Sequence, residues 1–277
     1  IASALFPSSR FGVTYWRDQI RFVQRELSVW GGEGDVMMGY SPETDNAEGG
    51  GVLENMDAAE VVRNIIPGTG LRIEGRLDSL FQLGYDARGP WTLGRIGLHR
   101  GRVGGLGLVR ETVAALLESR GQAASALEGL AAAHAKTLLN DSLEFSRLVF
   151  DFESREEGIA LRMLSITMED AEFRGEGVIG FDQSVALWGN VILGTKLSED
   201  LVASASAVAP LVAADGRLRV PVKIQGTTKD LDATVDERFL EALAAAARGE
   251  DVGPFVPMDP DARIVSELPS LQEHFYR

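Results

Sequence analysis

Hydrophobic and polar residues alternate along long stretches of this 277-residue chain. In the segment 71–77 the apolar residues occupy odd positions and the charged residues even positions, and the same parity continues through Tyr85. A period of two residues places successive side chains on opposite faces of a β-strand. The segment therefore predicts a strand with one apolar face and one charged face.

The same alternation predicts two blocks of strands. The extended segments of the first block are 11–29, 35–40, 71–85 and 91–103, and the last of these is interpreted as two short strands that turn at Arg100-Gly101. The segments of the second, more regular block are 145–152, 159–168, 172–181, 185–193 and 217–225. Because the connections are too short for the crossovers that parallel neighbours need, we expect an antiparallel meander.

Within segment 159–168 the alternation predicts two opposed sets of side chains. Ile159, Leu161 and Met163 are expected on one face, and Leu164 and Ile166 on the other.

Helices are predicted where the period changes to about 3.6 residues. Asp57 has the position of an N-cap before a short helix that ends near Ile66. The other predicted helices are 109–117, a helix that follows Gly121 and ends near Asn140-Asp141, a small-residue helix at 201–209 and a final helix at 236–248. The polar, glycine-rich segment 41–51 is expected to be a mobile loop.

These patterns predict a mainly β fold with accessory α-helices. We expect a long, curved antiparallel β-sheet that is capped by short amphipathic helices, with glycines inside the strands allowing it to bend. The predicted divisions are a first β-block with one short helix (1–104), a helical insertion (105–140), a second β-block with a terminal helix (141–248) and a proline-rich tail (249–277).

Composition and charge narrow the possible functions. A net charge of −14 without a stripe of Lys and Arg argues against nucleic-acid binding and against electrostatic adhesion to anionic membranes. The absence of cysteine excludes disulfides, thiolate metal sites and iron–sulfur clusters. The longest charge-free apolar stretch, 201–214, contains Pro210 and is shorter than the about 20 residues that a spanning helix needs. The chain begins at Ile1 rather than Met, which favours a fragment or a processed product.

No motif for catalysis or metal binding emerges. The three histidines, His99, His134 and His274, do not have metal-ligand spacing, and His134 is expected to be a buried core or interface residue. The glycine-rich run before the helix at 109–117 lacks the Lys-Ser/Thr of a phosphate-binding loop. We therefore predict a protein that is not an enzyme and has no cofactor and no metal, with a hydrolase or a sugar-binding β protein as a further alternative.

The apolar positions of the second block define one face of the predicted sheet. A strand of nine residues spans about 30 Å, so a curved meander with one apolar face can form a long apolar groove. The residues predicted to form its concave face are Leu148, Phe150, Phe152, Ile159, Leu161, Phe173, Ile179, Phe181, Leu187, Leu218, Val220, Val222 and Ile224. The alternative is that this face packs against helices as an ordinary core.

Two groups of motifs resemble those of the AsmA-like family, over residues 20 to 248. The first is Gly70 to Leu77 followed by Gly101 to Val109, and the second ends in the most specific signature, Gly216 to Thr227. The sequence departs from the family at 229–232, where Lys-Asp-Leu-Asp replaces Asp-Asp-Pro. The family's N-terminal membrane anchor and earlier repeats are not in this chain, so the chain would be the C-terminal region of a longer protein.

The resemblance implies a periplasmic protein of double-membraned bacteria that is anchored in the inner membrane through a segment not present in this chain. Its apolar β-groove would bind or conduct phospholipid or another acyl-chain ligand in biogenesis of the cell envelope and outer membrane, with envelope proteins as possible partners. The family offers no catalytic residues. The alternative function is a structural or scaffold module of an outer-membrane assembly or secretion system, whose apolar face is an ordinary core.

Overall fold

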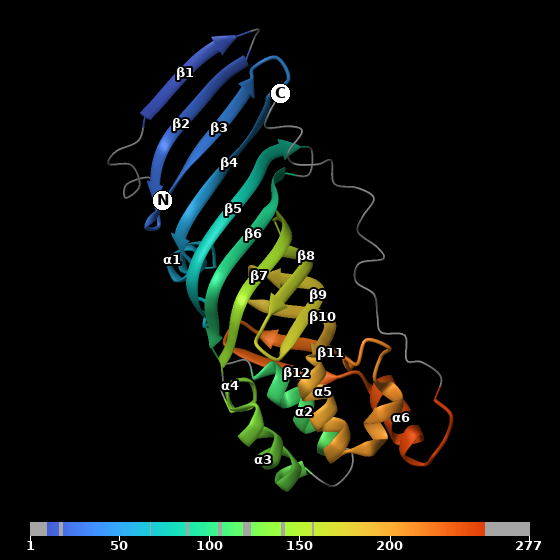
Figure 1. The fold of residues 1–277 in the computed structure, drawn as a ribbon. Helices are drawn as coiled ribbons and strands as arrows, with labels where there is room; N and C mark the ends of the chain where they lie inside the picture. Colours follow the sequence, from blue (N-terminus) through green and yellow to red (C-terminus); the bar gives the residue numbers. More distant parts are fainter. Residues whose placement is uncertain are drawn as a thin grey trace.

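One antiparallel sheet of 12 strands dominates the fold (Figure 1). The computed structural model describes residues 10–16, 19–66, 68–86, 89–104, 107–118, 123–139, 142–156 and 158–252. The strands follow one another in chain order, so β1 and β12 are the two edges of an open sheet. The strands are β1 Arg10–Trp16, β2 Gln19–Val29, β3 Gly32–Ser41, β4 Asn46–Asp57, β5 Arg72–Asp86, β6 Gly89–Gly104, β7 Ser142–Arg155, β8 Gly158–Thr167, β9 Ala171–Gly180, β10 Ser184–Leu193, β11 Arg219–Thr227 and β12 Asp230–Val235.

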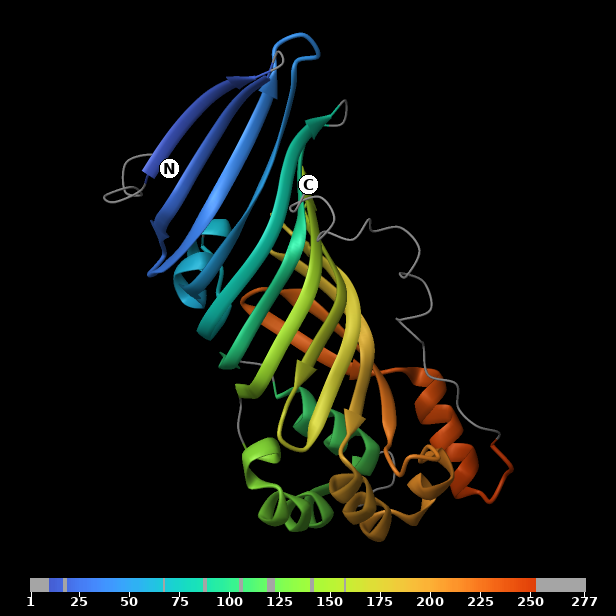
Figure 2. The ribbon, with the colours of Figure 1, turned by 45° about the horizontal axis from the view of Figure 1, so that its top comes forward.

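The helices are short and mostly lie at one end of the sheet (Figures 1 and 2). They are α1 Ala58–Ile65, α2 Leu108–Glu118, α3 Ala123–Ala133, α4 Ala135–Leu138, α5 Thr195–Ser204, the 3₁₀ helix η1 Ser206–Leu211 and α6 Glu237–Ala247. Of the helices in the described residues, α1 alone lies apart from this group, beside β4 and β5. Figure 2 shows that the strand direction turns along the sheet, so that β11 and β12 run across β6 to β8. The mainly β, antiparallel fold class predicted from the sequence is confirmed.

The strand register places apolar residues on one face across the whole sheet. Residues directly opposite each other on paired antiparallel strands have side chains on the same face. One row of such partners runs from β5 to β11 through buried apolar side chains only: Leu77, Leu98, Leu148, Ile166, Phe173, Val191 and Val220. Because β6 pairs directly with β7, both predicted β-blocks belong to the same sheet.

At the helical end, this apolar face forms an ordinary hydrophobic core. Leu116 of α2, Leu201 of α5 and Phe239 of α6 are fully buried in the same cluster as Phe173 and Val220. Full burial of a large apolar side chain contributes about 1.5–3 kcal/mol, so this end contains much of the stabilising burial.

Bulges interrupt four strands and change which face a side chain occupies. Each contains a non-glycine residue with positive φ: Glu26 in β2, Asn55 in β4, Arg100 in β6 and Met163 in β8. The extra residue of a bulge shifts the alternation by one position. The predicted opposition of Leu161 and Leu164 is therefore wrong, since both side chains lie on the apolar face and Met163 is exposed.

In two places the sequence predicts a turn or a loop where the structure has a continuous strand. The predicted turn at Arg100-Gly101 is a bulge inside the continuous 16-residue strand β6. The second half of the predicted loop 41–51 is the start of β4, whose glycines pair with β3 and β5. Gly51 suits this position because the ring of Phe81 lies over it.

The remaining corrections concern element limits. Segment 11–29 forms two strands, β1 and β2, and β12 was not predicted as a strand. The predicted helix at 201–209 begins earlier, as α5, and changes to η1 after Ser204. The single helix predicted after Gly121 breaks at His134 into α3 and α4. The proline-rich tail from residue 253 onward lies outside the described residues.

Candidate functional site

A cavity of about 190 Å³ lies against the apolar face between α1 and the strands β5 to β12. Thr228 is the one residue with a polar side chain in its lining, so the cavity offers a dry, apolar surface. The lining consists of Val61, Val62, Ile65, Ile66, Leu71, Ile73, Leu77, Ile96, Leu98, Val103, Leu143, Leu148, Phe150, Ile159, Leu161, Leu164, Ile166, Ile179, Val185, Leu187, Ile224, Thr228 and Leu231.

The helix α1 forms one wall of the cavity. It begins where the Asp57 carboxylate accepts hydrogen bonds from the backbone N–H of Ala59 (2.9 Å) and of Glu60 (3.1 Å), which confirms the predicted N-cap. Val61 is buried, whereas Ile65 is 43% exposed and still lines the cavity. The cavity therefore meets solvent beside Ile65.

Three connections meet at one end of the cavity. The stem of Lys229, in the turn between β11 and β12, lies directly against Gly70 in the segment after α1. The neighbouring Thr228 is buried, and its backbone N–H donates to the carbonyl oxygen of Gln183 in the turn between β9 and β10 (2.9 Å). Segments far apart in the chain thus close this end.

Two glycines lie in a register row that also contributes Leu161 and Leu187 to the cavity lining. Within one register row, Gly94 lies between Phe81 and Phe152, and Gly177 lies between Leu161 and Leu187. The ring of Phe152 lies over Gly94, and the Leu187 side chain lies over Gly177. The neighbouring side chains therefore cover the two row positions that carry no side chain.

The structure divides the 13 residues predicted for the concave face into two groups and two single positions. Those that line the cavity are Leu148, Phe150, Ile159, Leu161, Ile179, Leu187 and Ile224. Those buried in the hydrophobic core outside the cavity lining are Phe173, Leu218, Val220 and Val222. Phe152 is half-buried beside the cavity, with its ring edge-on to Phe150 (6.5 Å between centroids), and Phe181 is exposed in a turn.

Sequence reasoning missed the part of the lining that comes from α1, β5 and β6. The alternation of apolar and polar residues in β5 and β6 already places four of these lining residues on the apolar face. They are Ile73, Leu77, Ile96 and Leu98. What the sequence could not show is that β5 and β6 face β11 and β12 across the same cavity.

The apolar face continues beyond the cavity to β1. The register links Val13, Phe22 and Met38 across the first three strands, and each of these side chains is exposed. Phe11 and Phe22 lie on this same face, with ring centroids 6.2 Å apart. An exposed apolar surface thus extends from the cavity region toward the sheet edge.

The opposite face of the sheet is charged. Arg95 donates two hydrogen bonds to the buried carboxylate of Asp151 (2.6 and 2.9 Å), and Glu153 pairs with Arg155 and Arg162 on either side. These pairs satisfy the charges on the polar face, and the alternation of side chains along the strands places that face away from the cavity.

Comparison with protein-family models, with curated proteins and with solved structures finds no match. Among the described residues, no group of three or more His, Asp and Glu side chains has the arrangement of a metal site. No helix in the described ranges has both the length and the apolar character needed to cross a bilayer.

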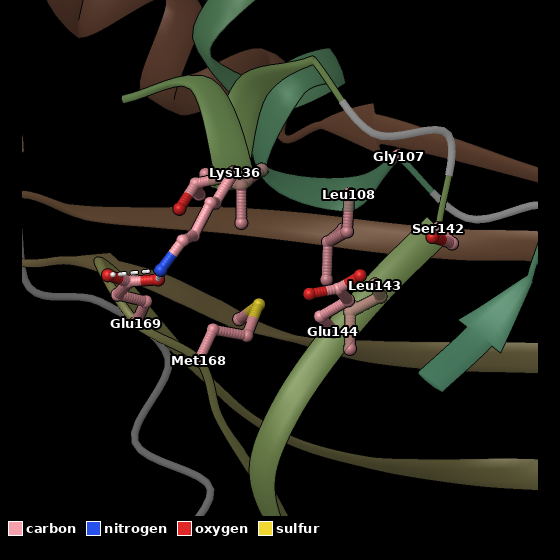
Figure 3. A pocket seen from close by; sticks show the side chains of 10 residues that line it. Gly107, Leu108, Lys136, Ser142, Leu143, Glu144, Met168 and Glu169 are labelled. Atoms are coloured by element: carbon pink, nitrogen blue, oxygen red, sulfur yellow. Dashed lines mark hydrogen bonds and ion pairs between the residues drawn. The ribbon is translucent and has the colours of Figure 1, made fainter. Parts of the chain in front are cut away.

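A second, much smaller cavity of about 40 Å³ lies between α2, α4 and β7 (Figure 3). Lys136 and Glu169 form an ion pair at its edge (3.1 Å), and Leu108 and Leu143 contribute apolar surface. Its volume suits about one water molecule, so it is a packing gap rather than a ligand site.

His134 is buried between two carboxylates, as the sequence predicts for a core histidine. Its Nδ1 lies 3.1 Å from Asp170, in the turn after β8, and its Nε2 lies 3.0 Å from Asp200 of α5. Desolvation lowers the pKa of His134, but the hydrogen bonds and negative charges of Asp200 and Asp170 outweigh it, so the pKa is raised above its usual value. The cluster ties α4, α5 and the sheet together and is structural.

Proposed function

We propose that this chain is a non-enzymatic module that binds the acyl chains of phospholipid, or of a similar amphiphile, along its apolar sheet face. The observation that supports the proposal is the apolar cavity below α1 together with the exposed apolar face that leads from it to β1. Following the resemblance to AsmA-like proteins, we place this activity in the periplasm, in a longer inner-membrane-anchored protein that serves envelope biogenesis.

The cavity volume sets the scale of the bound group. Since water, which is close to a methylene in size, takes about 30 Å³ in the liquid, a cavity of about 190 Å³ accepts roughly six methylenes. At about 0.8 kcal/mol for each buried CH₂, such a segment gains roughly 5 kcal/mol. The cavity would therefore hold part of one acyl chain, and the rest of the ligand would lie on the exposed apolar face or in solvent.

A scaffold role is the second candidate, and one observation favours it. Phe173, Val220 and Val222 are buried in the same core as α2, α5 and α6, so that end of the apolar face is an ordinary core. In a scaffold the cavity below α1 would be a packing defect without a ligand.

Two matched substitutions test the lipid proposal. Ile65 lines the cavity and is 43% exposed, while Val178 is 44% exposed on the charged face of β9. Ile65→Glu brings a carboxylate to the cavity mouth, and Val178→Glu makes the same change elsewhere. Because both side chains are already partly solvated, both variants are expected to fold.

The assay is a fluorescence titration with dansylundecanoate, followed by competition with phosphatidylethanolamine vesicles. We expect binding by the native chain, binding at least about tenfold weaker for Ile65→Glu, since burying a charge costs more than 1.4 kcal/mol, and native binding for Val178→Glu. Equal behaviour of the two variants, or no binding by the native chain, would argue for the scaffold.

A further inference from the structure

A polar cavity of about 320 Å³ lies on the charged face of the sheet, over β2, β3 and β4. These strands are at the end of the sheet away from α2, α5 and α6 (Figure 1). The lining residues are Gln19, Arg21, Met37, Gly39, Ser41, Asn46, Glu48 and Gly49. Arg21 precedes Phe22 of the apolar face, and neighbouring residues of a strand point to opposite faces. The polar cavity is therefore separated by the sheet from the apolar surface to which we assign lipid.

The strand register places two charged side chains on either side of an open position. Arg21 of β2, Gly39 of β3 and Glu48 of β4 lie directly opposite one another in one row. Because adjacent strands are about 4.8 Å apart, the backbones of β2 and β4 are about 10 Å apart, and Gly39 between them carries no side chain. A Cβ added at Gly39 would have its nearest neighbour, the carbonyl oxygen of Glu48, at 3.7 Å. The polar cavity therefore has one wall on β2, one wall on β4 and open space between them.

Each wall is a pair of polar side chains that hydrogen-bond to each other. On β2, Nη2 of Arg21 donates to the amide oxygen Oε1 of Gln19 (3.4 Å). On β4, the amide Nδ2 of Asn46 donates to Oε1 of Glu48 (3.2 Å). The register also places the hydroxyl-bearing Ser41 of β3 opposite Asn46. These contacts orient the polar groups on both sides of the open position.

The lining has the donors and acceptors that the hydroxyl groups of a ligand need. A guanidinium only donates and a carboxylate only accepts, while amides and hydroxyls do both. Different hydroxyls of one ligand can therefore accept from Arg21 and donate to Glu48. With one positive and one negative charge among the described lining residues, the polar cavity favours a ligand without net charge. An acyl chain fits poorly, since it would remove these polar groups from water without replacing their hydrogen bonds.

The volume of the polar cavity suits one sugar unit. Since water takes about 30 Å³ in the liquid, about 320 Å³ holds roughly eleven groups of that size, about the number of carbon and oxygen atoms in one hexose unit of an oligosaccharide. A sugar ring also has C–H groups that need an apolar contact. Met37 lines the polar cavity and is 46% exposed, so its side chain is available for that contact.

We infer that the polar cavity is a binding site for one unit of a neutral oligosaccharide. The hydroxyls of that unit would be held between Arg21 and Glu48 over Gly39, and the amides of Gln19 and Asn46 would make further hydrogen bonds. A sugar carboxylate would lie near the carboxylate of Glu48, so acidic sugars should bind more weakly. The inference does not depend on the lipid-binding proposal, because the two sites lie on opposite faces of the sheet.

Two glycine substitutions give a matched pair of variants. Gly39→Val places a branched side chain in the polar cavity, and β-branched residues are favoured in strands. Gly97→Val makes the same change on the charged face of β6, where a new Cβ has no heavy atom within 4 Å. Neither glycine has a positive φ, so both variants are expected to fold. A third variant, Glu48→Ala, removes a hydrogen-bond acceptor without filling the polar cavity.

The probes are four neutral tetrasaccharides, of glucose, galactose, mannose and N-acetylglucosamine, and one acidic tetrasaccharide of galacturonic acid. Each is titrated into the nitrogen-15-labelled full chain, and the amide chemical shifts measure the affinity and locate the ligand. We expect at least one neutral probe to shift amides of β2, β3 and β4, and the acidic probe to bind more weakly than it. Glu48→Ala should bind that neutral probe at least about tenfold more weakly, because a hydrogen bond to a charged group is lost. Gly39→Val should not bind it, and Gly97→Val should bind it as the native chain does.

Four results would overturn the inference. The first three are an absence of shifts with all four neutral probes, equal binding by Gly39→Val and Gly97→Val, and shifts confined to strands other than β2, β3 and β4. The fourth is tighter binding of the acidic probe than of every neutral probe, since the site would then select anions through Arg21.

Discussion

Alanine substitutions at Phe173 and Phe150 separate the core end of the apolar face from its cavity end. Both phenylalanines lie on the same face of neighbouring regions of the sheet, but Phe173 is fully buried, whereas Phe150 is half-buried and lines the cavity. Removing a fully buried phenylalanine costs about 3–5 kcal/mol, from lost transfer free energy and a new cavity. Phe150 already borders an empty volume of about 190 Å³, so Phe150→Ala enlarges an existing cavity.

We expect Phe150→Ala to cost about 1–2 kcal/mol, mainly the smaller apolar area returned to solvent and the lost ring contact with Phe152. The free energy of unfolding is measured by urea denaturation with intrinsic fluorescence, and an unchanged m-value would show that both variants unfold from the same compact state. At about 2–4 °C per kcal/mol for a chain of this size, the two melting temperatures should differ by about 2–16 °C. Equal losses for both variants would refute the division of the face into core and cavity.

Three further predictions concern stability. His134→Gln should reduce the pH dependence of the free energy of unfolding. A histidine with a raised pKa stabilises the fold fully below about pH 6.5, and this contribution is lost as pH rises through the raised value. Melting temperatures between pH 5.5 and 9 test this prediction, and an unchanged pH profile would contradict it. Gly94→Ala should lower the free energy of unfolding by about 1–3 kcal/mol, because its Cβ would overlap the adjacent strand. Gly97→Ala, on the same strand, has open space around the new Cβ and should lower it by less than about 1 kcal/mol. Equal losses in urea denaturation would be inconsistent with the close approach of the strands at Gly94. Asp57→Ala should cost about 1 kcal/mol through loss of the α1 cap, while Asp57→Asn should be nearly neutral in the same assay, and equal losses would argue against capping.

The strand pattern was sufficient to predict the apolar face but not its accessibility. Alternation in β7, β9 and β11 placed Phe150, Phe173 and Val220 on one face, as the register shows, because side-chain direction in a strand is a local property. Whether each side chain is covered depends on helices such as α2 and α6, which come from distant parts of the chain. The sequence therefore could not separate the core residues from the cavity residues.

Local conformation explains the other errors. The bulge at Met163 moves the following side chains of β8 to the opposite face from the one that simple alternation predicts. The sequence gives no sign of this bulge, because methionine rarely adopts the positive φ found there. The glycines of β4 suggested a loop, although they are needed where a neighbouring side chain such as Phe81 lies over the strand. In both cases a contact with the next strand determines the conformation.

Photo-crosslinking with a diazirine-bearing acyl chain tests whether the apolar cavity binds lipid. A phosphatidylethanolamine with the diazirine near the end of one acyl chain is incubated with the full chain, irradiated, and the labelled residues are identified by mass spectrometry. We expect labels around the cavity, at Ile65, Phe150 and Leu187, and we expect these labels to be lost when unlabelled lipid competes. Labels confined to the charged face, as at Val178, or an absence of competed labels would contradict it.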